Sequence, residues 1–234
     1  MNSIAASEET ARERREGWRD IAPVLIASLP IGLLFGALSV GKGLSVAETA
    51  LMSLLVFAGG AQFAAVELWG WPVPVVTLAF SALLINARHI LMGASLAPKL
   101  GSFSLVQRLT GLHLLTDETW ALAERRAMQR RLTPAYWFAL AGTLPFFWVA
   151  STLLGAWLGS FLGDPRRLGA DFAFTALFIG LTAAFWKGRV TAAAIAASGI
   201  ASAVTYVLAG PPWHVAAGAF AGIAAAYLAA SEKE

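Results

Sequence analysis

Long stretches without charged side chains are the feature that most constrains this chain. No Asp, Glu, Lys or Arg occurs in residues 21–41, 49–66, 68–87, 132–163, 172–186 and 190–231. A helix needs roughly 20 apolar residues to cross a hydrocarbon layer about 30 Å thick. A soluble helical core would need polar faces at helical spacing, and residues 190–210 offer none. The pattern therefore predicts an all-α, polytopic transmembrane helical bundle.

Seven apolar spans are predicted from these runs, at residues 22–40, 48–68, 73–96, 135–161, 171–187, 190–209 and 213–230. The last run divides at residues 210–212, where Gly-Pro-Pro cannot continue a helix. A weak sequence similarity between residues 51–59 and 172–180 is compatible with an internal repeat. We expect a retained, amphipathic cytoplasmic lead-in at 1–20, a transmembrane domain at 21–230 and a tail at 231–234. The domain comprises a first helical group (21–96), a polar helix with a basic loop (97–133) and a second helical group (134–230).

Arginine clusters predict the orientation, because basic residues in short flanks face the cytoplasm. They precede the first and fourth spans, at Arg12, Arg14, Arg15 and Arg19, and at Arg125, Arg126, Arg130 and Arg131. Three spans between them would place the clusters on opposite sides. We therefore expect one more crossing or a re-entrant helix, at 104–123, whose charges should face protein or a water-filled cavity. This gives eight passages with both ends inside, and six or seven true crossings are the alternative.

Composition excludes several function classes. Of the 234 residues, 58% are hydrophobic and 13% charged, and none is cysteine, so disulfides and thiolate chemistry are absent. Lys and Arg lie mainly at span ends rather than along one face, which favours membrane orientation over nucleic-acid binding. No Walker sequence, dinucleotide-binding loop or metal-spaced histidine pair occurs, so we expect no ATP use, cofactor or metal.

A glycine pair inside the second span is the first candidate binding element. Gly59 and Gly60 allow the helix to break, and the amide groups at the start of a half-helix can bind a carboxylate. Gln62 adds a side-chain amide donor. The alternative is close helix packing through small residues.

The third span contains polar residues, Asn86, Arg88 and His89. Arg88 lies roughly 22 Å along that helix, where an unpaired guanidinium costs at least ~2.5 kcal/mol. Asp117 or Glu118 is its expected partner, and snorkelling of Arg88 to the nearer interface is the alternative.

The polar helix is the third candidate. Spacing of i, i+4 and i+7 would place His113, Asp117 and Trp120 on one helical face, with Glu118 beside them. A carboxylate near an imidazole in a cavity can take up and release a proton. Alternatively, the two carboxylates neutralise arginines at a surface, namely Arg108, Arg125 or Arg126.

Three segments that contain candidate residues, at 57–63, 86–89 and 116–118, follow two segments that contain glycine, at 30–36 and 43–48. The five segments and their order resemble the AzlC-type branched-chain amino acid permease family. The resemblance extends over about residues 17–230. It implies the large subunit of a two-component exporter of branched-chain or similar aliphatic amino acids in the bacterial cytoplasmic (inner) membrane. It also implies a small hydrophobic AzlD-type partner subunit.

A secondary transporter, rather than an enzyme, is therefore the leading hypothesis, with coupling to the proton gradient. The residues expected to bind substrate are Gly59, Gly60, Gln62 and Asn86. Those expected to form the ion pair or carry the proton are Arg88, His89, His113, Asp117 and Glu118. The alternatives are a membrane-embedded enzyme that uses the histidines and carboxylates as acid, base or metal ligands, and a chain that only scaffolds another pore.

Overall fold

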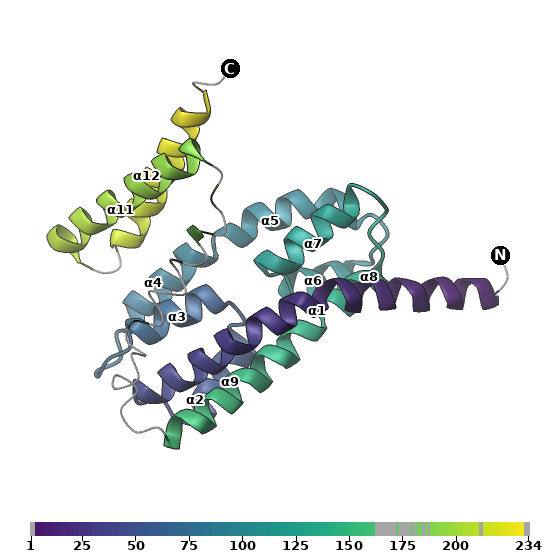
Figure 1. Cartoon of the computed structure of the whole chain (residues 1–234), viewed down its shortest axis with the longest axis horizontal. Helices are drawn as coiled ribbons and strands as arrows, with labels where there is room; N and C mark the ends of the chain where they lie inside the picture. Colours follow the sequence, from purple (N-terminus) through teal and green to yellow (C-terminus); the bar gives the residue numbers. More distant parts are fainter. Residues whose placement is uncertain are drawn as a thin grey trace. The chain divides into compact units, whose positions relative to one another are not determined.

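A computed structural model of the chain describes residues 3–161, 188–210 and 213–231, with five single positions between 171 and 187. Every regular element in these residues is a helix (Figure 1), which confirms the all-α prediction for this part of the chain. The chain divides into two compact units. Unit 1 comprises Met1–Gln62 with Asn86–Pro165, and unit 2 comprises Phe63–Ile85 with Arg166–Glu234.

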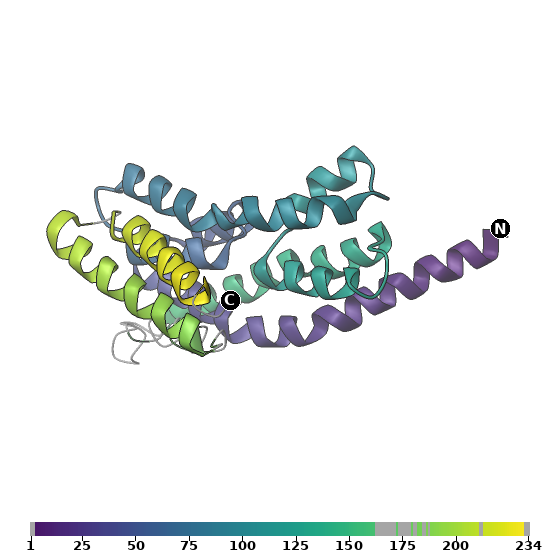
Figure 2. The same ribbon diagram turned by 90° about the horizontal axis from the view of Figure 1, so that it is seen from above.

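Helix α1 (Ser3–Gly41) is the longest element of unit 1, and it lies against α8 (Pro134–Ala141) and α9 (Thr143–Phe161). The lead-in is thus helical and continuous with the first span, and its first turns project beyond the packed helices (Figure 2). A Cβ atom at Gly36 would lie 2.0 Å from the Thr152 carbonyl oxygen, and one at Gly155 2.1 Å from that of Leu33. Glycine at both positions is what allows the two backbones to approach so closely.

The fourth predicted span is interrupted between α8 and α9, at Gly142. Pro145 lies in the first turn of α9 and has no N–H to donate to the residue one turn earlier, which favours a new helix start here. The core of unit 1 lies beside this point. It is formed by buried apolar residues of α1, α5, α7 and α8, including Ile21, Leu96, Ala123, Tyr136, Trp137 and Leu140.

Short helices make up the middle of the chain. They are α2 (Val46–Leu55), α3 (Gly59–Glu67), α4 (Val75–Asn86), α5 (Arg88–Leu96), the 3₁₀ turn η1 (Ala97–Leu100), α6 (Leu105–His113) and α7 (Asp117–Ala127). The predicted span 48–68 is therefore not one helix but two, of 10 and 9 residues. Each is about half the length that a bilayer crossing requires.

In unit 2, α11 (Arg189–Ala209) and α12 (Trp213–Ser231) form a closely packed pair. A Cβ atom at Gly218 would lie 2.0 Å from the Ser202 hydroxyl, so a small residue is needed at this crossing. Phe80 of α4 contacts Trp213, with ring centroids 5.3 Å apart. The predicted division of the last apolar run is confirmed, because α11 ends before Gly210 and α12 begins at Trp213.

Five helical stretches among the described residues are long and apolar enough to cross a membrane: Ala6–Gly41, Val75–Leu100, Pro134–Phe161, Arg189–Ala209 and Trp213–Ser231. They correspond to five of the seven predicted spans. Most of the predicted span 171–187 lies outside the described residues, as does most of the second half of the possible repeat. The count of seven spans and the internal repeat therefore stay predictions.

Candidate translocation site

The helix break expected at the glycine pair is present. Helix α2 starts with a capping box between Ser45 and Glu48 and ends at Leu55, and α3 starts at Gly59. Between them Phe57 has a positive φ of 40°. The backbone N–H of Gln62 donates a hydrogen bond to the Ala58 carbonyl oxygen at 2.9 Å. The first amide groups of α3 have no acceptor within their own helix. The sequence thus predicted the start of a half-helix correctly.

Gln62 is fully buried, and its side chain is bound to protein groups. Its amide nitrogen donates to the Ser53 hydroxyl at 3.3 Å, and its amide oxygen accepts from the Trp148 indole at 3.0 Å. The Trp148 ring also covers the start of α3, because a Cβ atom at Gly59 would lie 3.6 Å from it. Gln62 therefore links α2, α3 and α9, and Trp148 is the residue next to the half-helix that sequence reasoning missed.

We predict that Gln62→Leu lowers stability, because it leaves the Trp148 indole and the Ser53 hydroxyl buried without their partner. The expected cost is about 1–3 kcal/mol. The midpoint of thermal unfolding in detergent measures it, with exposed Gln129→Leu as the matched control. If Gln62 instead binds substrate, the unfolding midpoint will stay constant while the KM for transport rises.

A second helix break, which the sequence did not reveal, separates α4 from α5 at Ala87. Arg88 is the first residue of α5, and the His89 imidazole Nδ1 lies 3.1 Å from the Asn86 carbonyl oxygen. The Asn86 side-chain oxygen is buried and has no hydrogen-bond partner among the described residues. Among the described residues, a polar acceptor without a partner therefore lies two positions before Arg88.

The predicted partner of Arg88 is confirmed as Asp117, at 2.6 Å between guanidinium and carboxylate. Asp117 is the first residue of α7, so its negative charge lies at the positive end of a helix dipole. Helix α7 lies outside the five candidate spans. Burial raises the pKa of the Asp117 carboxyl above its usual value; Arg88 and His89 counteract this, whereas Glu118 adds to it.

The polar segment 104–123 is not one helix, which corrects the expected face of His113, Asp117 and Trp120. Helix α6 ends at His113, and Thr116 caps a new helix by accepting a hydrogen bond from the Thr119 amide. A capping threonine followed by two acidic residues is a signal for a helix start that could have been recognised. His113 and Glu118 are both exposed, and neither belongs to the Arg88–Asp117 pair.

Further polar contacts join α5 to α7 beyond the ion pair. The Trp120 indole donates to the Ser95 hydroxyl at 2.8 Å, and this hydroxyl donates to the Glu124 carboxylate at 3.0 Å. Lys99 forms an ion pair with Glu124. Sequence reasoning missed this set, although Trp120 and Glu124 lie four residues apart on α7, and Ser95 of α5 lies four residues before Lys99 of η1.

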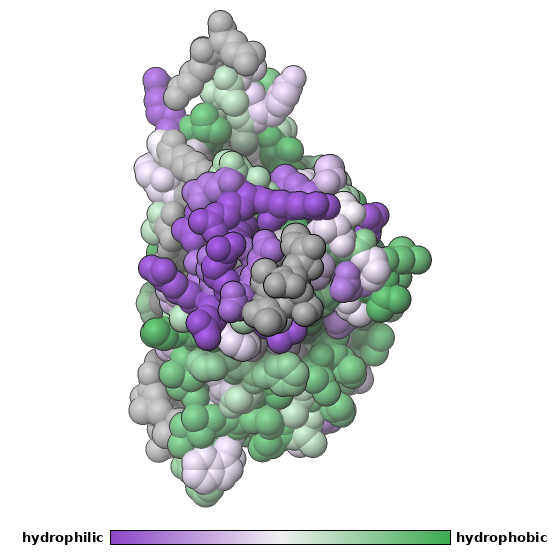
Figure 3. Space-filling model, turned by 90° about the vertical axis from the view of Figure 1, so that its right-hand side faces the viewer, coloured by the Kyte–Doolittle hydropathy of each residue, from purple (hydrophilic) through white to green (hydrophobic). Residues whose placement is uncertain are grey.

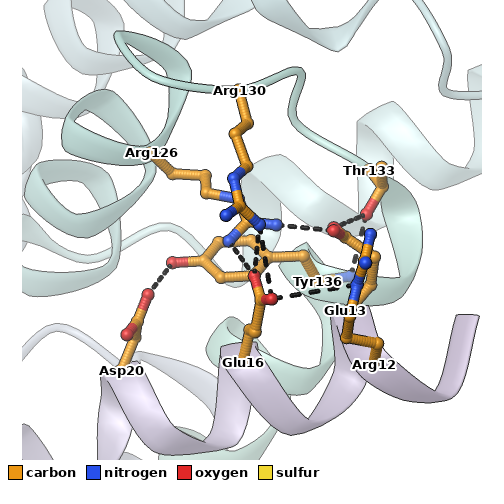
Figure 4. Close-up of polar contacts among 8 residues, drawn as sticks. All are labelled: Arg12, Glu13, Glu16, Asp20, Arg126, Arg130, Thr133 and Tyr136. Atoms are coloured by element: carbon orange, nitrogen blue, oxygen red, sulfur yellow. Dashed lines mark hydrogen bonds and ion pairs between the residues drawn. The ribbon is translucent and has the colours of Figure 1, made fainter. Parts of the chain in front are cut away.

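Arginines in the last turn of α7 and just after this helix are held by carboxylates of α1 (Figure 4), rather than by Asp117 or Glu118. Arg126 pairs with Glu13 at 2.6 Å and with Glu16, and Arg130 pairs with Glu16 at 3.3 Å. Arg108 donates instead to the Phe103 carbonyl oxygen, at 3.1 Å. These contacts place both arginine clusters at the same end of unit 1, as the orientation argument requires.

These features define a polytopic helical membrane protein with interrupted helices and an ion pair at one interruption. Half-helix ends of this kind form ligand sites in many secondary transporters. Among the described residues, no group of three or more His, Asp or Glu side chains is placed to hold a metal ion.

The chain belongs to the AzlC family, because the model of this family, described as AzlC protein, matches residues 23–162. An uncharacterized membrane protein of Archaeoglobus fulgidus is 32% identical, over 77% of this chain and 80% of its own. Inner membrane protein YgaZ of Escherichia coli is 30% identical, over 78% of both chains. The branched-chain amino acid transport protein AzlC of Bacillus subtilis is 26% identical, over 70% of this chain and 64% of its own. No solved structure matches.

Proposed function

We propose that this chain is the large subunit of a secondary transporter that exports branched-chain or similar aliphatic amino acids across the bacterial cytoplasmic membrane. The observation that carries the proposal is the Arg88–Asp117 ion pair, formed where the candidate span Val75–Leu100 is interrupted. The Bacillus subtilis relative, named for branched-chain amino acid transport, supports the substrate class.

The ion pair suits a zwitterionic substrate, because an amino acid carries one group for each partner. The substrate carboxylate would take the place of Asp117 at Arg88, and the ammonium would donate a hydrogen bond to an oxygen of the released carboxyl group, whether that group is ionised or protonated. The side-chain oxygen of Asn86, which has no partner in the described part of the chain, is a further acceptor for the ammonium. The first amides of α3, at Gly59 and Gly60, offer a second place for a carboxylate.

Proton coupling would act on the same pair. Protonation neutralises Asp117 and releases Arg88, which then attracts the substrate carboxylate. The raised pKa of Asp117 supports this role, because it brings protonation of the carboxyl closer to neutral pH. The charged and titratable neighbours of the carboxyl are Arg88 and His89 of α5 and Glu118 of its own helix. His89 would then act on the pair through its charge, which counteracts the rise in the Asp117 pKa.

A small hydrophobic AzlD-type subunit is the proposed partner. Large apolar side chains are exposed on α11 and α12, including Ile200, Val207, Phe220 and Leu228. Such surfaces fit lipid or another membrane helix.

Proteoliposomes test the proposal. The chain is co-reconstituted with its AzlD-type subunit, the vesicles are loaded with labelled valine, and a pH gradient is imposed. We expect unchanged valine to appear outside, faster with the gradient than after a protonophore collapses it. A chemically altered product would instead support a membrane-embedded enzyme. Valine that remains inside under both conditions would contradict transport.

A further inference from the structure

A basic pocket lies beside the ion pairs of Arg126, between α1 and the end of α7. It has a volume of about 420 Å³ and is open to the surface. Its walls are charged or polar side chains: Glu16, Arg19, Asp20, Arg125, Arg126, Gln129 and Arg130. Nothing in the transport proposal uses this pocket.

Positive charge is in excess in this pocket, where four arginines meet two carboxylates. Both carboxylates already have partners. Glu16 is bound by Arg126 and Arg130, and Asp20 accepts the Tyr136 hydroxyl at 2.7 Å. Arg19 and Arg125 form no ion pair within the described part of the chain.

Arg126 is held rigidly at the centre of the pocket wall. Its side chain is only 9% exposed, and its guanidinium carbon lies 4.3 Å from the centre of the Tyr136 ring. Its Nε is buried and has no hydrogen-bond partner among the described residues. That atom is closed to solvent, so the exposed Arg19 and Arg125 offer the donors that a ligand can reach, and planar guanidinium groups suit the oxygens of a phosphate.

The pocket lies where α1 enters its apolar part. Arg19 and Asp20 directly precede residue 21, the first residue of a charge-free run, and the neighbouring Trp18 is 53% exposed. Figure 3 shows hydrophilic residues gathered in a patch on this face, bordered by apolar residues. Exposed tryptophan and clustered arginine at the end of a span are typical of the headgroup layer.

We infer that this pocket binds a phosphate group, and that the headgroup of an anionic phospholipid supplies it. Arg19 and Arg125, which form no ion pair among the described residues, provide the attraction, and Arg126 holds the pocket wall in place. A lipid is the favoured source because the pocket lies at the start of a membrane span.

Lipid binding to the purified full-length chain tests this inference. Protein in a neutral detergent is titrated with phosphatidylglycerol or phosphatidylcholine, and bound lipid is counted by native mass spectrometry. A second arm replaces lipid with inorganic phosphate. Arg19→Gln/Arg125→Gln removes the two unpaired charges. Arg15→Gln/Arg131→Gln is the matched control, because it removes the same charge from the same two segments but outside the pocket.

We expect phosphatidylglycerol to bind about tenfold more weakly to the pocket variant, and less than about twofold more weakly to the control. Phosphatidylcholine should bind weakly to all three proteins. Binding of inorganic phosphate alone, with the same dependence on Arg19 and Arg125, would support the phosphate site but assign it a soluble ligand. An equal loss in both variants, or no binding of either probe, would overturn the inference.

Discussion

Arg88→Ala and Asp117→Asn are each expected to reduce valine efflux at least about tenfold at equal protein levels in the membrane. Removing one partner of a desolvated charge pair costs about 2–5 kcal/mol, and the partial exposure of this pair, 41% and 39%, lowers that figure. Efflux from proteoliposomes under a fixed pH gradient is the measurement. Glu9→Gln is the control, because this exposed carboxylate of α1 forms no ion pair among the described residues and is not a neighbour of the Asp117 carboxyl.

The two variants should differ in exchange at equal pH on both sides. Asp117→Asn mimics the protonated carboxyl and leaves Arg88 available for the substrate carboxylate, so exchange should continue while the response to the pH gradient is lost. Arg88→Ala should abolish both. Equal efflux by both variants and the wild type would show that the pair lies outside the translocation path.

A reversed pair separates a structural role from a transport role. If the pair only joins α5 to α7, Arg88→Asp/Asp117→Arg should restore both stability and efflux. If the pair instead carries the proton and binds substrate, the reversed pair should restore neither proton coupling nor the orientation in which the substrate binds. It would also place an arginine at the start of α7, where the helix dipole disfavours positive charge. Recovery of full efflux in the reversed pair would contradict the mechanism.

Local sequence signals were sufficient for several parts of the site. Charge-free runs predicted all five candidate spans that occur among the described residues, because the length needed to cross a bilayer is fixed. Gly59 and Gly60 predicted the break before α3, since adjacent glycines weaken a helix. The charge of Arg88 inside an apolar span predicted a carboxylate partner, and the structure provides Asp117.

Other parts depend on contacts that no local pattern contains. The break at Ala87 has neither glycine nor proline to mark it. The partners of Gln62 could not be predicted, because an amide in a half-helix can bind substrate or another helix, and Trp148 is 86 residues away. The pairing of Arg126 with Glu13 joins residues 113 apart, so the packing of α1 against α7 and α8 is what brings them together.

Arg126→Ala should lower the free energy of unfolding by about 3–5 kcal/mol. The reason is Glu13, whose side chain is only 8% exposed and would keep, among the described residues, the Thr133 hydroxyl at 2.6 Å as its one remaining hydrogen-bond partner. Thermal unfolding in detergent and abundance in the membrane are the measurements. Arg130→Ala is the control, since its side chain is 58% exposed and its ion pair should contribute at most about 1 kcal/mol.

A second variant identifies the cause of that loss. If an unpaired buried carboxylate destabilises Arg126→Ala, removing this carboxylate as well should recover much of the stability. The variant is Glu13→Leu/Arg126→Leu, because apolar residues of similar size often replace a buried ion pair without penalty. Transport per folded molecule should stay near the wild-type value, because the pair lies apart from Arg88 and Asp117. A double variant that is no more stable than Arg126→Ala would show that the arginine acts through its contact with the Tyr136 ring instead.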